Sequence, residues 1–160
     1  MNDRLCIKYM RDSLIDNATD PRVQWTSNSR VWIHTDRPLT SASYPRVRIT
    51  KRGPSERVII SMGENFWEWR EMVLDIQFWT QIGFRWKNSD NEYLQDDYLV
   101  EEYLHHLWAT LKAQQSTLRT TYGITGLKNV QEGVPYQEPG TQLWTGILSV
   151  RVWYFWRNDS

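Results

Sequence analysis

Residues 66–82 read FWEWREMVLDIQFWTQI, and this stretch decides the fold. Polar side chains occupy the alternate positions Glu71, Asp75, Gln77 and Gln81, and the positions between them are apolar: Met72, Leu74, Ile76, Phe78 and Ile82. A period of two is typical of a strand with one buried face. We therefore predict one long strand over residues 66–82, with a layer that covers its apolar face.

An amphipathic helix is predicted after this strand. Apolar residues recur at three-, four- and seven-residue steps from Val100 to Leu118 and form one stripe. Ser89 stands three residues before a glutamate, the spacing of a capping box, and Gly123 is a typical helix stop. The pattern predicts one continuous helix over about residues 89–121.

The remaining segments supply partners for these two elements. A short helix is expected at 3–15, a polar connection at 36–44, and strands at 23–26, 30–35, 46–50, 57–62, 127–132, near 136 and at 143–156. The three strands from 46 to 82 have short turns, which predicts an antiparallel meander. The last strand alternates so regularly that we expect it at the centre of the sheet.

This order of elements predicts an α+β fold, in which an antiparallel sheet packs against one long α-helix, with a short N-terminal helix. We expect a single domain over 1–160, divided into the N-terminal helix (1–20), a strand meander (21–88), the long helix (89–122) and C-terminal strands (123–157).

Composition excludes several classes of protein. The 19 Lys and Arg balance the 19 Asp and Glu, so bulk charge indicates no attraction to nucleic acid or membrane. The single cysteine, Cys6, excludes an internal disulfide. Charges throughout residues 1–15 argue against a signal peptide, and no apolar run approaches a membrane span.

Aromatic content is the unusual feature, with 10 Trp, 8 Tyr and 4 Phe. At roughly 150–250 Å² per ring, these side chains would bury on the order of 4,000 Å². Exposure of a quarter of them would exceed the roughly 300–600 Å² that is typical of a monomer's largest apolar patch. Two readings stay open, a crowded core and a chain that also buries aromatic surface against another subunit.

Metal and nucleophile patterns are weak. Glu101 with His105, and Glu102 with His106, are i,i+4 pairs that could chelate a metal, but no third ligand has suitable spacing. Cys6 has no catalytic signature around it, so we expect a packed thiol.

Two further patterns could indicate catalysis or phosphate binding. Glu71 and Asp75 share one strand face at a separation that a glycosidase could use, although such pairs are common without catalysis. Residues 123–128 contain two glycines and a lysine but lack the spacing of a phosphate loop. We therefore predict no enzyme, no catalytic residue, no cofactor and no metal.

Basic residues recur in residues 46–52, and arginines flank a run of aromatic residues in 151–157. Strands of this kind can stack bases and hold phosphates, so a nucleic-acid-binding module is the alternative function. An amphipathic strand whose arginine stems cover apolar surface is the competing interpretation.

The order of elements and their sequences resemble the tail-terminator or tail-completion (neck) proteins of tailed viruses. The resemblance covers roughly residues 3–157 as a pattern of elements: the N-terminal helix, the segment from Val31 to His34, the Pro-led strand from Tyr44 to Ile49, the hairpin into residues 72–79, the helix and the terminal aromatic strand.

The resemblance implies a structural, non-enzymatic virion protein for head–tail joining. Such subunits form a ring, commonly a hexamer, at the head-proximal end of the tail tube, where the ring ends tube assembly and docks to a head connector or adaptor protein. DNA would pass through the ring without specific binding, no membrane is involved, and assembly takes place in the host cytoplasm.

Exposed rings and long loops are what we expect at the contacts between subunits of such a ring. The predicted subunit-interface residues are Trp67, Trp69, Trp153 and Phe155. The segments 50–56 and 123–140 are predicted to reach across to a neighbouring subunit.

Overall fold

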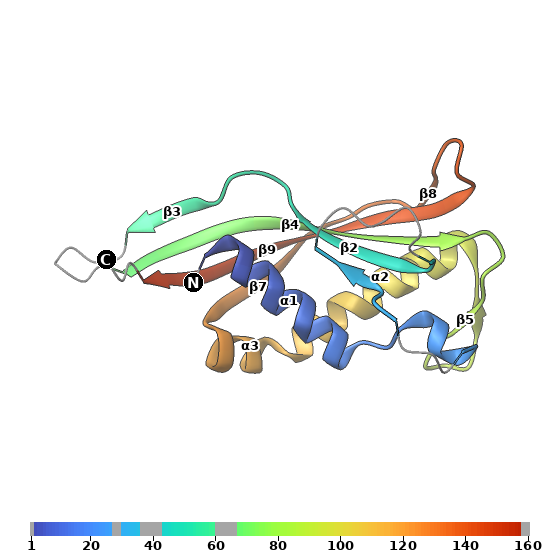
Figure 1. Ribbon diagram of the computed structural model, residues 1–160, viewed down its shortest axis with the longest axis horizontal. Helices are drawn as coiled ribbons and strands as arrows, with labels where there is room; N and C mark the ends of the chain where they lie inside the picture. The colour runs from blue at the N-terminus through green and yellow to red at the C-terminus, as the bar shows by residue number, and fades with distance from the viewer. Residues whose placement is uncertain (1, 27–29, 36–42, 60–66, 158–160) are drawn as a thin grey trace.

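The computed structural model describes residues 2–26, 30–35, 43–59 and 67–157. It has two layers, one main sheet and a layer of helices (Figure 1). The three α-helices lie on the same side of the sheet, and the two longest strands extend past the helices at one end (Figure 1). The predicted α+β class is confirmed.

Two long strands form the centre of the sheet. β4 (Trp67–Gln81) and β9 (Leu143–Arg157) pair antiparallel without a register shift over their whole length. Fifteen residues at about 3.3 Å each give a ladder about 50 Å long. Both strands, and the central position of the last one, were predicted from the period of two.

The other strands lie along the two edges of this ladder. On the β4 side are β2 (Arg46–Lys51) and β3 (Glu56–Ile59), with the two-residue β1 (Ile33–His34) parallel to β2. On the β9 side are β7 (Ile124–Glu132) and β8 (Tyr136–Gln137). A separate small hairpin joins β5 (Trp86–Lys87) to β6 (Tyr93–Leu94).

Alternate side chains of the ladder and the apolar stripes of the helices form one core. The helices are α1 (Asp3–Asn17), α2 (Asp96–Ala113) and α3 (Gln115–Tyr122). The most deeply buried members are Met10 and Leu14 of α1, Leu99, Tyr103 and Leu107 of α2, and Leu74, Ile76, Phe78, Val150 and Tyr154 of the ladder. The ladder is therefore buried on the helical side, as its alternation predicts.

The prediction of one continuous helix over 89–121 is wrong in detail. Residues 88–92 form a turn in which the Asn88 side-chain oxygen accepts from the amides of Asp90 and Glu92, at 3.0 and 2.9 Å. Such local bonds compete with helix formation, so the capping-box interpretation of Ser89 fails. The helix begins only at Asp96 and is interrupted near residue 114, whereas the predicted stop at Gly123 is confirmed with a φ of 73°.

The meander prediction is also corrected. β2 and β3 do not pair with each other; both pair with the same edge of β4, so they follow one another along it. Parts of the segments 50–56 and 123–140 pair within the chain's own sheet, and their predicted contact with a neighbouring subunit stays a prediction.

A third difference from the prediction, at residues 23–26, is explained by local capping. The strand expected at 23–26 is replaced by the 3₁₀-helix η1 (Pro21–Gln24), which Asp20 caps by accepting from the Arg22 amide at 3.0 Å. Most of the predicted polar connection (36–42) and the end of the predicted strand 57–62 lie outside the described residues.

Gly146 of β9 is where α2 approaches the sheet most closely. A Cβ at this position would lie 2.7 Å from Val100 Cγ1 and 3.1 Å from Leu104 Cδ1. We expect Gly146→Ala to lower the free energy of unfolding by about 1–3 kcal/mol, because α2 must shift outward. Urea denaturation followed by circular dichroism measures this.

The matched control is Gly53→Ala, since a Cβ there meets nothing within 4 Å. Its stability should stay unchanged or rise by up to about 1 kcal/mol, because alanine restricts the unfolded chain. Equal losses in the two variants would contradict the close packing of α2 on β9.

Candidate subunit-interface surface

The face of the ladder turned away from the helices carries the predicted site residues. Figure 1 shows the three α-helices on the opposite side of the sheet. Side chains on this face alternate with the core positions, and we call it the helix-free face. Its members on the two central strands are Trp69, Glu71, Val73, Asp75, Gln77, Trp79, Thr145, Ile147, Ser149, Arg151, Trp153 and Phe155.

Three of the four predicted interface residues meet at the projecting end of the ladder. Trp69 and Phe155 are direct partners across β4 and β9, and their rings stack with centroids 5.6 Å apart and planes 11° apart. Trp153 follows two positions along β9 on the same face. We call these three residues the arm patch. The backbone of Trp67 pairs with Arg157, but the Trp67 side chain lies outside the described residues.

Hydrogen bonds to β7 fix the arm patch. Trp69 Nε1 donates to Thr125 Oγ1 at 2.9 Å, and that hydroxyl donates to the Trp153 carbonyl oxygen at 3.2 Å. The polar edge of Trp69 is thereby satisfied within the subunit. Trp69 and Phe155 nevertheless stay 38% and 36% exposed, so the stacked pair offers preorganised apolar surface.

Trp153 is less available than predicted. Its Nε1 donates to Glu71 Oε2 at 3.0 Å, and its ring lies against Gly126, where a Cβ would come within 3.1 Å of Cε3. The missing side chain at Gly126 gives the ring room to lie against the sheet, so Trp153 is half-buried. Trp153 therefore offers less free surface to a neighbouring subunit than Trp69 and Phe155 do.

A second exposed aromatic group lies at the other end of the molecule, beside β5 (Figure 1). The rings of Trp25 and Tyr93 are 6.3 Å apart, and Trp25 Nε1 donates to the Arg85 carbonyl oxygen at 2.7 Å. The cations of Arg85 and Lys87 lie 4.9 and 5.6 Å from the Tyr93 ring centroid. We call these four residues the β5-end patch.

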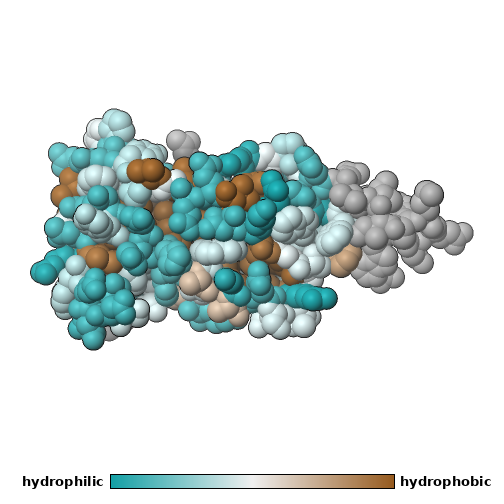
Figure 2. Space-filling model, turned by 180° about the vertical axis from the view of Figure 1, so that it is seen from behind, coloured by the Kyte–Doolittle hydropathy of each residue, from teal (hydrophilic) through white to brown (hydrophobic). Residues whose placement is uncertain are grey.

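The aromatic side chains divide between the core and the surface of the chain, and burial of the exposed ones against another subunit stays a prediction. Six rings are buried (Trp32, Phe78, Trp79, Trp86, Tyr103 and Tyr154), and six are exposed among the described side chains (Trp25, Trp69, Tyr93, Tyr98, Tyr136 and Phe155). On the face drawn in Figure 2, the described apolar residues form small separate groups within a hydrophilic surface. Four of the six exposed rings belong to the arm patch and the β5-end patch.

The two carboxylates weighed as a glycosidase pair are occupied by arginines. Asp75 Oδ1 lies 2.9 Å from an Arg52 guanidinium nitrogen and accepts from Ser149 Oγ at 2.8 Å. Glu71 Oε1 lies 2.9 Å from Arg151 Nε, and its other oxygen accepts from Trp153. These contacts order the helix-free face and leave no free acid–base pair there.

Of the candidate metal and thiol groups, Glu101, Glu102 and His105 are exposed, whereas His106 and Cys6 pack against neighbouring residues. No cluster of three or more His, Cys, Asp or Glu that could hold a metal occurs within the described ranges. Cys6 is buried in α1, and burial raises the pKa of its thiol far above the ordinary range. His106 lies beside the Trp86 and Tyr103 rings, 5.9 and 5.5 Å between centroids.

No protein-family model matches the chain, and no curated protein matches it. Within the described part of the chain, no helix combines the length and apolar character that a membrane crossing needs.

His106 makes stability depend on pH. Burial lowers the pKa of its imidazole, so the native state takes up a proton at lower pH than the unfolded state, whose pKa is about 6.5. The unfolded state then binds more protons in this window, and the free energy of unfolding should fall as pH drops below about 6.5. Chemical denaturation at pH values from 8 to about 5.5 measures the slope.

The neighbouring exposed His105 supplies a matched control. His106→Gln should reduce the pH dependence, of which a part remains because burial and nearby arginines also lower the pKa of His34. His105→Gln should leave the slope unchanged. If the two variants show the same slope, the burial of His106 is not the cause.

Proposed function

We propose that this chain is a structural subunit that closes into a ring, and that the ring ends a viral tail tube at its head-proximal end. The observation that carries the proposal is the stacked Trp69–Phe155 pair, fixed at the projecting end of the ladder and more than a third exposed on each ring. Rigid aromatic side chains are typical anchors of protein–protein interfaces.

The positions of the two aromatic groups favour a ring over a two-fold dimer. A closed ring is built from heterologous contacts, in which two different surfaces of each subunit meet. The arm patch lies at the end of the long axis where β3 is labelled in Figure 1, and the β5-end patch lies at the opposite end, beside β5. Contact between one patch and the other patch of the next copy would repeat around a closed rotation.

The site of action in a virion rests on the resemblance of the element pattern. Under the proposal, one side of the ring contacts the tail-tube protein, and the other docks to a head connector or adaptor protein. The chain would act in the neck of the particle without enzymatic chemistry, and DNA would pass through the ring without specific binding.

The alternative, a nucleic-acid platform on the Arg-rich strands, has less support. The guanidinium of Arg46 lies over the Tyr44 and Trp79 rings, at 4.4 and 5.3 Å from their centroids. Arg52 and Arg151 are held in the ion pairs with Asp75 and Glu71. Arginines engaged in this way have fewer donors left for phosphates.

Removal of the stacked pair tests the proposal. We expect the wild-type chain to form rings in negative-stain images and to have the corresponding solution mass. Phe155→Ala, alone and with Trp69→Ala, should weaken association by about 2 kcal/mol or more, because a central aromatic anchor is lost. Circular dichroism establishes whether the variants remain folded.

Val130→Ala serves as the control, since Val130 of β7 is 41% exposed and lies outside both aromatic patches. This variant should associate like the wild type. A wild-type chain that stays monomeric and binds oligonucleotides in a salt-sensitive manner would contradict the proposal and favour the nucleic-acid function.

A further inference from the structure

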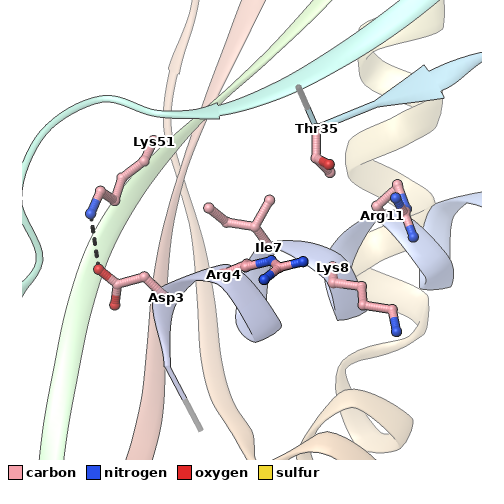
Figure 3. Close-up of a pocket in the computed structure, with 7 residues that line it drawn as sticks. All are labelled: Asp3, Arg4, Ile7, Lys8, Arg11, Thr35 and Lys51. Carbon is pink, nitrogen blue, oxygen red and sulfur yellow. Dashed lines mark hydrogen bonds and ion pairs between the residues drawn. The ribbon is translucent and has the colours of Figure 1, made fainter. Parts of the chain in front are cut away.

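Although its net charge is zero, the molecule carries separated charges on its helical side. A cavity of about 530 Å³ beside α1 is lined by Arg4, Lys8 and Arg11 of α1 and by Lys51 of β2 (Figure 3). We call these four residues the basic groove. The three residues from α1 follow one another at steps of four and three, so they share one face of that helix.

Acids nearby pair with only two of the four groove cations. Arg11 is held by its chain neighbour Asp12, whose Oδ1 lies 3.0 Å from the Arg11 guanidinium. Asp3 is its one lining carboxylate, and Lys51 Nζ lies 3.0 Å from it, while Tyr154 also donates to the same carboxylate. Figure 3 shows Lys51 turned toward Asp3, with the charged ends of Arg4 and Lys8 directed elsewhere. Within the described ranges, neither Arg4 nor Lys8 has an acidic partner, and both are exposed.

The start of α2 carries the opposite charge. Residues 88–111 contain six acids and no Lys or Arg. Five of these acids are exposed and have no ion pair among the described residues; we call them the acidic end, and they are Asp90, Glu92, Asp97, Glu101 and Glu102. The helix dipole accounts for an acid in the first turn of α2, but its effect falls off before Glu101 and Glu102.

Arg4, at the far end of the basic groove, is too distant from the acidic end to pair with it within one molecule. The end of α1 meets α2 where Tyr103 Oη donates to the Thr19 carbonyl oxygen at 2.6 Å. Arg4 lies about 20 Å back along α1 from that contact, at 1.5 Å per residue. Arg4 and the acidic end could therefore pair with each other only between two copies of the chain.

We infer that the basic groove of one copy receives the acidic end of α2 from a second copy. A two-fold contact through either surface would place like charges opposite each other, so the charges favour a head-to-tail arrangement. The aromatic patches are arranged in the same direction along the molecule as the charges. The strand ends that carry the arm patch project beyond the N-terminal end of α1, and the β5-end patch lies beside the start of α2 (Figure 1). This inference rests on the proposed ring, and it identifies the contact that would set the head-to-tail arrangement of the copies.

Charge reversal tests the contact. Variant A carries Arg4→Glu and Lys8→Glu, and variant B carries Glu101→Lys and Glu102→Lys. Each variant alone presents like charges at both surfaces, so its self-association should weaken by roughly tenfold or more relative to wild type. In an equimolar mixture, the groove of A, now acidic, can pair with the α2 start of B, now basic. The unchanged basic groove of B can pair with the unchanged acidic end of A. Association should therefore return in the mixture.

Sedimentation velocity measures these species in about 10 mM and about 1 M salt, where the Debye length is about 30 Å and about 3 Å respectively. The charge-conserving variant with Arg4→Lys and Lys8→Arg should associate like the wild type at both concentrations. These substitutions lie on the exposed surface, and circular dichroism checks that each variant is folded.

The outcomes separate this inference from the proposed function. Rings that persist in A alone or B alone, or a mixture of A and B that associates no better than either, would overturn the groove contact while the ring stands. A wild-type chain that remains monomeric at low salt would contradict both. Oligonucleotide binding that is lost in A, with self-association intact, would assign the groove to a phosphate chain and overturn the inference.

Discussion

Pairing between β4 and β9 is the interaction on which the rest of the structure depends. Fifteen consecutive positions of each strand face one another without a register shift. Because side chains alternate, this single register places Leu74, Ile76, Val150 and the other apolar residues under the helices. The same register places the tryptophans, arginines and carboxylates on the helix-free face. A slip of one residue would exchange the two sets.

The length of the ladder gives the molecule two dissimilar ends. The helices cover only part of it, and the strands continue past them to the arm patch (Figure 1). At the other end, the turn after β4 leads into the β5–β6 hairpin and the acidic start of α2. Dissimilar ends on a rigid body suit repeated head-to-tail contacts, and this links the fold to the proposed ring. In the proposed ring, charge and aromatic surface together would determine which end of one copy meets which end of the next.

The sequence predicts the elements whose signal is local and periodic. β4, β9, β2 and α1 all have clear alternation or a clear apolar stripe, and their predicted bounds agree with the structure to within a few residues. The errors arise where side chains bond to the nearby backbone. Asn88 organises a turn in place of the first turns of the predicted helix, and Asp20 caps a 3₁₀-helix where a strand was expected.

The candidate site was predictable only where its signal is local. Alternation places Trp69, Trp153 and Phe155 on one face, but the pairing of Trp69 with Phe155 depends on a register between residues far apart in the chain. The supports from Thr125 and Gly126 come from β7, which carried only a weak strand signal. Long-range partners of this kind leave no mark in a local pattern, so Trp153 was predicted as more exposed than it is.

Residue-resolved amide hydrogen exchange tests the central claim, that the ladder is rigid along its whole length and holds the arm patch in place. The account predicts that hydrogen-bonded amides of β4 and β9 exchange slowly from the centre of the sheet out to Trp69 and Phe155. Rapid exchange at this end, as in a fraying terminus, with slow exchange only under the helices, would contradict it.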